Sequence, residues 1–253
     1  MTFAVRLAPL VSEVMTLESL LISKDASVLG VLRPTLEKLA VSVEVCSGLQ
    51  TGSEMLRKHK FDAIIVDCDD LPGGVELLTS VRTTQSNATS VAFAVLNGNT
   101  TTQQAFQLGA NFVLQKPLTP LNASRCFNAA LNFMVRERRR YFRHPLEMPV
   151  AITLPGGLEL KAKTTNLSEG GMAIRATGNL PKDKDVVANF RFTLPGSAAP
   201  LDLRGKAAWA DGSGNAGIRF VEMPQGSQLQ LEKWITERLQ EELPAQLQAY
   251  LKV

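Results

Sequence analysis

The sequence predicts a doubly wound α/β domain with a parallel sheet, followed by an all-β antiparallel barrel that ends in a helix. Over residues 17–134, short apolar runs alternate with helix-length segments, as right-handed βαβ units require. Over residues 150–221, short strand-like runs follow one another between clusters of Gly, Pro, Asn and Asp. A run of arginines separates the two patterns, so we expect domains at residues 1–135 and 136–253.

The composition is that of a globular protein with sizeable hydrophobic cores, since 45% of the 253 residues are hydrophobic and 20% are charged. A formal net charge of +3 does not demand a polyanionic partner. The three cysteines are far apart and only two histidines are present, so we expect buried thiols and neither disulfides nor a metal site. No apolar run reaches the roughly 18 residues of a membrane-spanning helix, and no signal peptide is indicated, so we expect a cytoplasmic protein.

In the first half, the expected strands are short apolar runs, at residues 20–22, 41–45, 63–66, 91–96 and 112–114. The run at 63–66 is apolar throughout, which suits a parallel strand buried on both faces. Apolar residues recur at helical spacing from Val28 to Leu39, so a helix follows the first strand, and another is expected from Met55. A last, amphipathic helix is expected at 121–135.

In the second half, the expected strands lie between turn residues, at 150–154, 158–164, 172–176, 186–194, 201–209 and 216–221. The expected turns lie at residues 155–157, 178–179, 195–196 and 211–212. Apolar residues at helical spacing from Leu231 to Leu239 predict a final helix. The aromatic residues Trp209 and Phe220 are expected to pack in the core of the barrel.

Five arginines lie between Arg136 and Arg143, at the domain boundary. Pro145 disfavours helix at His144, so this arginine string is expected to become extended near its end. Taken alone, the string has three interpretations. It is a solvated helix end that meets the negative end of the helix dipole, a phosphate-binding patch for DNA or RNA, or a small-ligand site in which guanidinium forks bind phosphates and guanine edges.

A second motif, Asn166-Leu167-Ser168-Glu169-Gly170-Gly171, lies between two expected strands and contains natural turn residues. We expect the two glycines to adopt unusual backbone torsions and to allow close approach of another molecule. Together, Arg139-x-x-x-Arg143 and Asn166-x-Ser168-x-x-Gly171 resemble the two-part signature of PilZ domains. The resemblance covers about residues 136–240, where a Trp-bearing strand is followed by a Gly-x-x-Phe strand, as in that family.

This resemblance implies that the second half binds the bacterial second messenger cyclic di-GMP. Arg139 and Arg143 are then expected to bind phosphate and the Hoogsteen edge of guanine. Asn166 and Ser168 are expected to contact guanine or phosphate, while Gly171 leaves room at the turn. In this family an arginine at the position of Arg138 is often associated with a stacked ligand dimer, so the resemblance implies two ligands per site. No cofactor and no resident metal ion are expected.

The first half resembles the receiver domain of response regulators, which has a flavodoxin-like fold, over roughly residues 17–134. The residues that carry the resemblance are Val66-Asp67, Leu71-Pro72-Gly73-Gly74, Gly109-Ala110 and Lys116-Pro117. It implies that Asp67 accepts a phosphoryl group and that Lys116 pairs with the phosphate.

Three departures from the receiver pattern argue against phosphorylation. The acidic cluster after the first strand is reduced to Ser23-Lys24-Asp25, where magnesium chemistry favours more carboxylates. The hydroxyl residue of the fourth strand is replaced by Asn97, and Cys68 stands in the register of the phosphoacceptor. Because phosphoryl transfer needs metal and lysine together, we expect a pseudo-receiver that serves as an interaction domain.

We therefore expect a signalling protein that is not an enzyme. Its ligand, held by the arginine string and the barrel, changes the domain arrangement and the interaction with an unknown protein partner of the receiver-like half; a homodimer is also compatible. No Ser/His/Asp arrangement or phosphate-binding glycine loop is visible in the sequence. Two alternatives stay open, namely a response regulator driven by phosphorylation and a polyanion or nucleic-acid binder that uses the same arginines.

Overall fold

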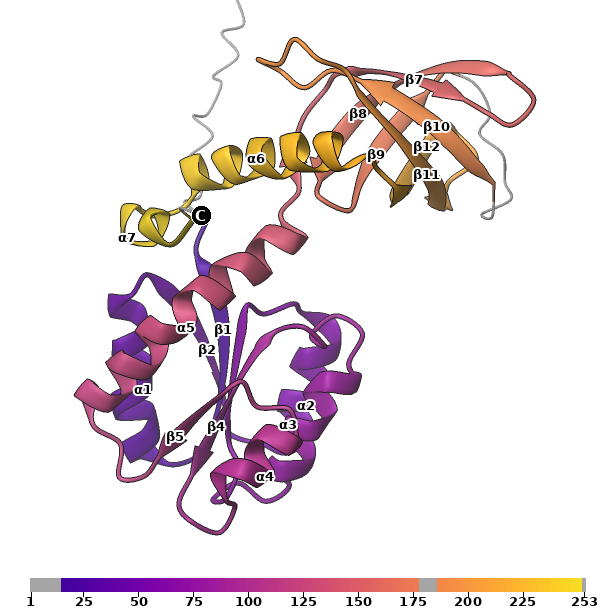
Figure 1. The fold of residues 1–253 in the computed structure, drawn as a ribbon. Helices are drawn as coiled ribbons and strands as arrows, with labels where there is room; N and C mark the ends of the chain where they lie inside the picture. The colour runs from indigo at the N-terminus through magenta and orange to yellow at the C-terminus, as the bar shows by residue number, and fades with distance from the viewer. Residues whose placement is uncertain (1–14, 178–185, 252–253) are drawn as a thin grey trace, which may run out of the picture.

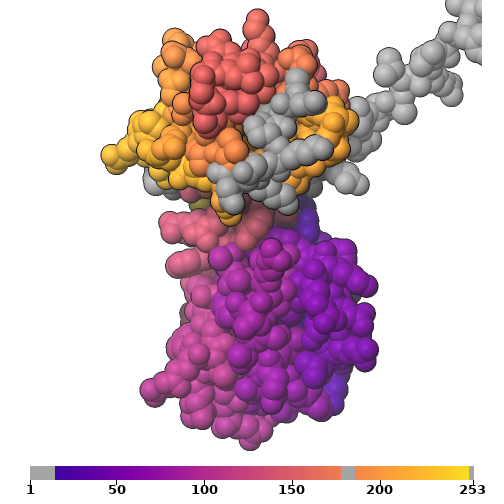
Figure 2. Space-filling model, turned by 90° about the vertical axis from the view of Figure 1, so that its right-hand side faces the viewer, coloured from indigo at the N-terminus to yellow at the C-terminus, as the bar shows by residue number. Residues whose placement is uncertain are grey.

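The computed structural model describes residues 15–177 and 186–251, which form an α/β body and a β-barrel joined through one long helix (Figure 1). The two bodies meet at a narrower neck, which Figure 2 shows in space-filling form. The turn expected at Gly178-Asn179 lies outside the described residues.

The α/β body is built on a parallel sheet with the strand order β2-β1-β3-β4-β5. Its strands are β1 (Leu17–Ile22), β2 (Val41–Cys46), β3 (Ala63–Asp67), β4 (Val91–Leu96) and β5 (Phe112–Gln115). Its helices are α1 (Ala26–Lys38), α2 (Leu49–Lys58), α3 (Gly74–Thr83), α4 (Thr102–Gln107) and α5 (Pro120–Tyr141). The expected doubly wound α/β domain is thereby confirmed.

Helices cover both faces of this sheet, with α1 and α5 on one side and α2, α3 and α4 on the other (Figure 1). Strands β3 and β4 are consequently buried along their whole length, as their continuous apolar runs predict. Helix α2 begins at Leu49, earlier than the expected Met55. The first turn of the helix is mostly polar, so the apolar pattern does not indicate where it starts.

The barrel closes through antiparallel pairing in the order β8-β7-β10-β11-β12-β9, and β9 pairs again with β8. Its strands are β7 (Pro149–Thr153), β8 (Glu159–Ser168), β9 (Gly171–Ala176), β10 (Val187–Phe192), β11 (Leu201–Ala210) and β12 (Asn215–Glu222). A short strand, β6 (His144–Pro145), pairs with β8 beside β7 and was not expected. Alternate residues of β10 are buried, which places Phe190 and Phe192 in the barrel core.

Helix α5 leaves the α/β body and reaches the neck between the two bodies. The sequence predicts its end near residue 135, but the helix continues to Tyr141. The arginine string is therefore helical up to that residue and is not an extended linker there, and the expected domain boundary falls inside α5. The backbone becomes extended at Phe142, near the point that Pro145 predicts.

The C-terminal segment returns from the barrel to the α/β body. The expected final helix is α6 (Gln225–Glu242), and the shorter α7 (Ala245–Gln248) that follows was not expected. The Tyr250 hydroxyl then donates a hydrogen bond of 3.3 Å to Asn128 of α5. One hydrophobic core accordingly continues from a face of the parallel sheet, along α5, into the barrel.

Two side chains test the expectation of aromatic packing in the barrel. Phe220 is partly buried and packs against the core. Trp209 is 49% exposed, so its expected burial in the core is wrong. The indole lies instead over Gly217 of the neighbouring strand, where a Cβ atom would come within 2.2 Å of it. Within the described residues, no helix is long and apolar enough to span a membrane.

Candidate ligand-binding site

The second sequence motif forms a tight hairpin between β8 and β9. Ser168 pairs with Gly171, which leaves Glu169 and Gly170 as the tip, and the Ser168 hydroxyl donates a hydrogen bond of 2.9 Å to the Gly171 carbonyl. Asn166 was expected in a turn but lies within β8, next to an irregularity in the register at residues 164–166. The motif therefore places its polar residues at the end of a strand.

The short strand β6 brings the arginine string to this hairpin. His144 pairs with Leu167 and Pro145 pairs with Asn166 in antiparallel register. Continuing that register by one residue puts Arg143 beside Ser168. Arg143 is exposed, so its guanidinium is accessible at the edge of the motif.

Asn166 carries an unsatisfied buried atom. Its side-chain oxygen Oδ1 is shielded from solvent and accepts no hydrogen bond from any described residue. Buried polar atoms are nearly always paired, so an orphaned oxygen needs an explanation, and at a functional site a donor from a ligand supplies one. The sequence singled out Asn166 by motif, but only the structure shows this unmet acceptor.

Arg139 lies on the last turn of α5 and faces the barrel. Its Nε atom lies 2.6 Å from Oε1 of Glu169 at the hairpin tip, and its Nη1 atom lies 3.4 Å from the Thr236 hydroxyl of α6. Burial raises the pKa of the Glu169 carboxyl, and the charge of Arg139 opposes that rise. The structure thus joins the two halves of the sequence motif through an internal ion pair.

The two glycines of the hairpin have different roles from those expected. Neither residue has a positive φ, so the expectation of unusual torsions is wrong. A Cβ atom on Gly171 would lie 2.3 Å from the carbonyl oxygen of Ile218, so close packing of β9 on β12 requires glycine there. A Cβ atom on Gly170 would meet no atom within 4 Å, so the tip itself is open.

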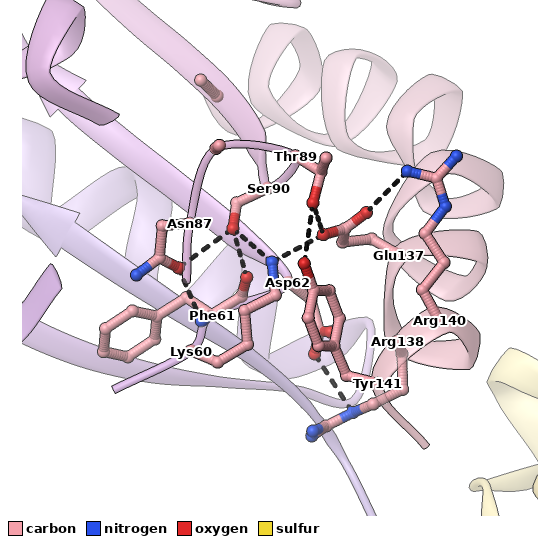
Figure 3. Close-up of polar contacts among 12 residues, drawn as sticks. Lys60, Phe61, Asp62, Asn87, Thr89, Ser90, Glu137, Arg138, Arg140 and Tyr141 are labelled. Carbon is pink, nitrogen blue, oxygen red and sulfur yellow. Dashed lines mark hydrogen bonds and ion pairs between the residues drawn. The ribbon is translucent and has the colours of Figure 1, made fainter. Parts of the chain in front are cut away.

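Arg138 points toward Asp62 of the α/β body (Figure 3). Its Nη2 atom donates to the Thr16 carbonyl and lies 2.9 Å from Glu18, while its Nε atom lies 3.3 Å from Asp62. Burial raises the pKa of Asp62 to about 6, and the charge of Arg138 counteracts part of that rise. Of the sequence-predicted ligand residues, Arg138 alone is held by the other domain.

A buried polar cluster on the neighbouring side of α5 completes this anchor (Figure 3). Glu137 is 3% exposed and accepts hydrogen bonds from Lys60 at 2.6 Å and from Thr89 at 2.5 Å. The Lys60 ammonium also lies 4.2 Å from the ring centroid of Tyr141, whose hydroxyl is 3.0 Å from that of Thr89. Sequence reasoning missed this cluster, although a single glutamate inside a string of arginines was a usable signal.

A groove of about 680 Å³ opens beside the hairpin tip. Arg140, Glu169 and Gly170 line this groove together with residues of β12 and α6. The Arg140 guanidinium lies 3.6 Å from Glu137 and is half exposed. The groove therefore gives the side chains at the hairpin tip room to move.

A second polar site lies at the carboxyl ends of the parallel strands. Lys116 contacts Asp67 at 3.1 Å, Asp25 at 3.0 Å and Asp70 at 2.6 Å. Burial opposes the charge of Lys116, but its bonds to these carboxylates raise its pKa. One oxygen from each aspartate lies within 4.8 Å of the others, an arrangement that can hold a divalent cation.

Within this site, Asp67 and not Cys68 faces the lysine. The Cys68 thiol lies 3.5 Å from the Val66 carbonyl, and burial raises its pKa to about 12. Asp67 accepts a hydrogen bond from Ser23, and its other oxygen, Oδ1, is buried without a partner among the described residues. The expectation of a pseudo-receiver, in which Asp67 is not phosphorylated, stays a prediction.

Comparisons with known proteins assign both halves of the chain. A family model of the PilZ domain matches residues 137–237, and one of the response regulator receiver domain matches residues 20–124. No curated protein matches the chain.

Solved structures match each half separately. A PilZ domain of CeSA from a cellulose-synthesizing bacterium is 19% identical, covers 38% of this chain and 97% of its own, and has a TM-score of 0.33. A chemotaxis response regulator of Vibrio cholerae is 19% identical, with coverage of 46% and 98% and a TM-score of 0.42. A response regulator from Chloroflexus aurantiacus is 23% identical, with coverage of 48% and 100% and a TM-score of 0.43.

Proposed function

The chain carries a response regulator receiver domain followed by a PilZ domain, and from this premise we propose that it is a signalling effector that binds cyclic di-GMP at the junction of α5 with the barrel. PilZ domains are receptors for this dinucleotide. The observation that carries the proposal for this chain is the unpaired acceptor Oδ1 of Asn166, which lies on β8 beside β6, the short strand that the exposed Arg143 directly precedes. A guanine base offers N–H donors to the first and acceptor edges to the second.

Arg139 and Arg143 suit the two phosphates and the guanine edges because guanidinium is always charged, planar and forked. Asn166 and Ser168 contribute neutral hydrogen bonds from the end of β8, and Gly171 keeps the β9 backbone close to β12. Hydrogen bonds to charged groups contribute about 1.5–3 kcal/mol each. Several of them supply affinity in the micromolar range, about −8 kcal/mol, after the cost of ordering.

Because Arg138 is held by Glu18 and Asp62 of the receiver domain, we propose that one ligand binds per site, in place of the stacked pair that the family resemblance alone suggests. Arg138 then positions α5 and leaves ligand contacts to Arg139 and Arg143. The number of ligands per chain, measured by calorimetry, tests this: a value of two removes the proposal.

Cyclic di-GMP binding changes the domain arrangement in this proposal, since α5 is fixed to the receiver domain by Arg138 and to the barrel by Arg139. Small-angle scattering with and without the dinucleotide checks it, and identical curves argue against it. The cytoplasmic location and an interaction of the receiver domain with a protein partner stay predictions.

The direct experiment is a calorimetric titration with cyclic di-GMP, run beside GTP and cyclic AMP. We expect micromolar binding of the first and none of the others. Arg143→Lys keeps the charge and loses the fork, so its affinity falls about tenfold or more. Arg136→Lys, an exposed arginine of the same string, is the matched control and binds as the wild type does. Unchanged affinity of Arg143→Lys contradicts the assigned role.

A polyanion binder is the rival reading of the same arginines. It predicts a steep salt dependence and no preference among polyanions, whereas a built pocket discriminates strongly between nucleotides. A phosphorylation-driven regulator is the other rival, in which Asp67, beside Lys116, carries the phosphoryl group. Labelling with acetyl phosphate separates it from the proposed function.

A further inference from the structure

The contact between Glu169 and Arg139 occupies one of the arginines that the proposed function needs. Their closest atoms are 2.6 Å apart, and the side chains of Arg139 and Glu169 are only 21% and 19% exposed. Neither Nε of Arg139 nor Oε1 of Glu169 has a hydrogen-bond partner among the described residues, so the contact is a close ion pair without an aligned hydrogen bond. A phosphate that binds Nε needs the space that this carboxylate occupies. A ligand phosphate that reaches Nε of Arg139 must therefore displace the Glu169 carboxylate.

Glu169 is placed for this contact by the fold. It stands at the first position of the two-residue hairpin tip, directly after Ser168 of the binding motif. The charged groups that influence its carboxyl are Arg139 and Arg140, which favour its charge, and Glu232, which opposes it. Because burial is the largest effect on its pKa and raises it, the carboxylate is held in an unfavourable environment that Arg139 only partly offsets.

The groove beside the hairpin tip has room for the displaced Glu169 side chain. Glu169, Gly170 and Arg140 line the same groove, and the tip is open because a Cβ atom on Gly170 would meet nothing within 4 Å. Arg140 is half exposed and has Glu137 at 3.6 Å as its partner. The carboxylate of Glu169 can thus leave Arg139 and move closer to Arg140 while the hairpin stays folded.

We propose that Glu169 is an internal competitor of the ligand, which neutralises Arg139 in the free protein and is exchanged for a phosphate of cyclic di-GMP on binding. This inference rests on the proposed function, because it assigns Arg139 to ligand phosphate. Glu169 is a residue that sets affinity without contacting the ligand. It also explains how a partly buried arginine stays paired before the ligand arrives.

The test is Glu169→Gln, which preserves the shape of the side chain and removes its charge. A neutral amide competes less well than a carboxylate, so we expect cyclic di-GMP to bind about tenfold more tightly. Glu159→Gln, an exposed residue at the far end of β8, is the matched control and leaves the affinity unchanged. Thermal unfolding of both variants confirms that they fold, and Glu169→Ala serves as a second variant.

The pH dependence of binding gives an independent readout. Burial raises the pKa of the Glu169 carboxyl, and protonation of this group removes the competitor. Lowering the pH therefore strengthens binding to the wild type more than to Glu169→Gln. If the wild type binds and Glu169→Gln binds equally or more weakly, the inference is overturned while the proposed function stands. If neither protein binds the dinucleotide, both are overturned. If only Glu169→Gln binds, both are supported.

Discussion

Replacing Asp62 by asparagine tests the anchor that holds the arginine string to the receiver domain. Burial raises the pKa of Asp62 from 3.8 to about 6, despite Arg138 at 3.3 Å. That shift corresponds to about 3 kcal/mol. Since the folded-state pKa is the higher one, the folded protein binds the proton more tightly than the unfolded chain does. The free energy of unfolding therefore rises as the pH falls from about 6 to about 4, by roughly 1.4 kcal/mol per pH unit from this group alone.

The asparagine variant removes this contribution while keeping an oxygen that accepts the hydrogen bond from the Glu18 amide. Urea unfolding at several pH values between about 4 and 7 measures the difference between variant and wild type. We expect that difference to change by about 2–3 kcal/mol across the range, since part of the full shift lies below about pH 4. Asp202→Asn, an exposed aspartate paired with Arg191, is the control and follows the wild type. Parallel profiles for wild type and Asp62→Asn would refute the reasoning.

Three further predictions concern other parts of the structure. Arg138→Gln leaves the buried Asp62 without its cation, so we expect the free energy of unfolding to fall by about 2–4 kcal/mol. Calorimetry should find unchanged cyclic di-GMP affinity and one ligand per chain. Weaker binding would instead indicate that Arg138 contacts the ligand. Gly171→Ala places a methyl group against the Ile218 carbonyl and destabilises the barrel by about 1–3 kcal/mol in chemical unfolding. Gly170→Ala is the control and has a much smaller effect. Equal losses of unfolding free energy in the two variants would contradict this. Acetyl phosphate with magnesium leaves Asp67 unlabelled, because Lys116 is already bound to three carboxylates. Detection of a phosphoryl group on Asp67 by mass spectrometry would show that the receiver domain is active.

The sequence was most informative where one physical pattern dominates. Strand β4 was predicted with its observed bounds, Val91–Leu96, because a strand covered on both faces must be apolar at every position. The strands of the barrel were located to within a few residues because turn residues punctuate them. The two-part arginine and Asn-x-Ser motif was found through its spacing, and the hairpin and the β6–β8 pairing bring its two halves together.

The sequence was least informative about α5, whose end depends on tertiary contacts. A string of arginines has no apolar period, so the pattern stops near residue 135. Buried pairing of Glu137 with Lys60 and of Arg138 with Asp62 carries the helix on to Tyr141. These partners lie more than 70 residues away in the chain, and neither composition nor spacing links them. The same limit applies to Trp209. A register shift between Ala207 and Trp209 decides which side of the barrel the indole lies on, and the sequence pattern does not show that shift.

The end of α5 explains why neighbouring arginines serve different domains. Successive residues of a helix point about 100° apart, so Arg138 faces the receiver domain while Arg139 faces the barrel. In a continuous helix, Arg139 and Arg143 would lie on one face, one turn apart. The helix ends at Tyr141 instead, and the extended Phe142 delivers Arg143 to the edge of β8. The Phe142 amide donates hydrogen bonds to the carbonyls of Arg138 and Arg139. A ligand that binds both Arg139 and Arg143 would therefore act on the same turn of α5 that Arg138 holds to the receiver domain.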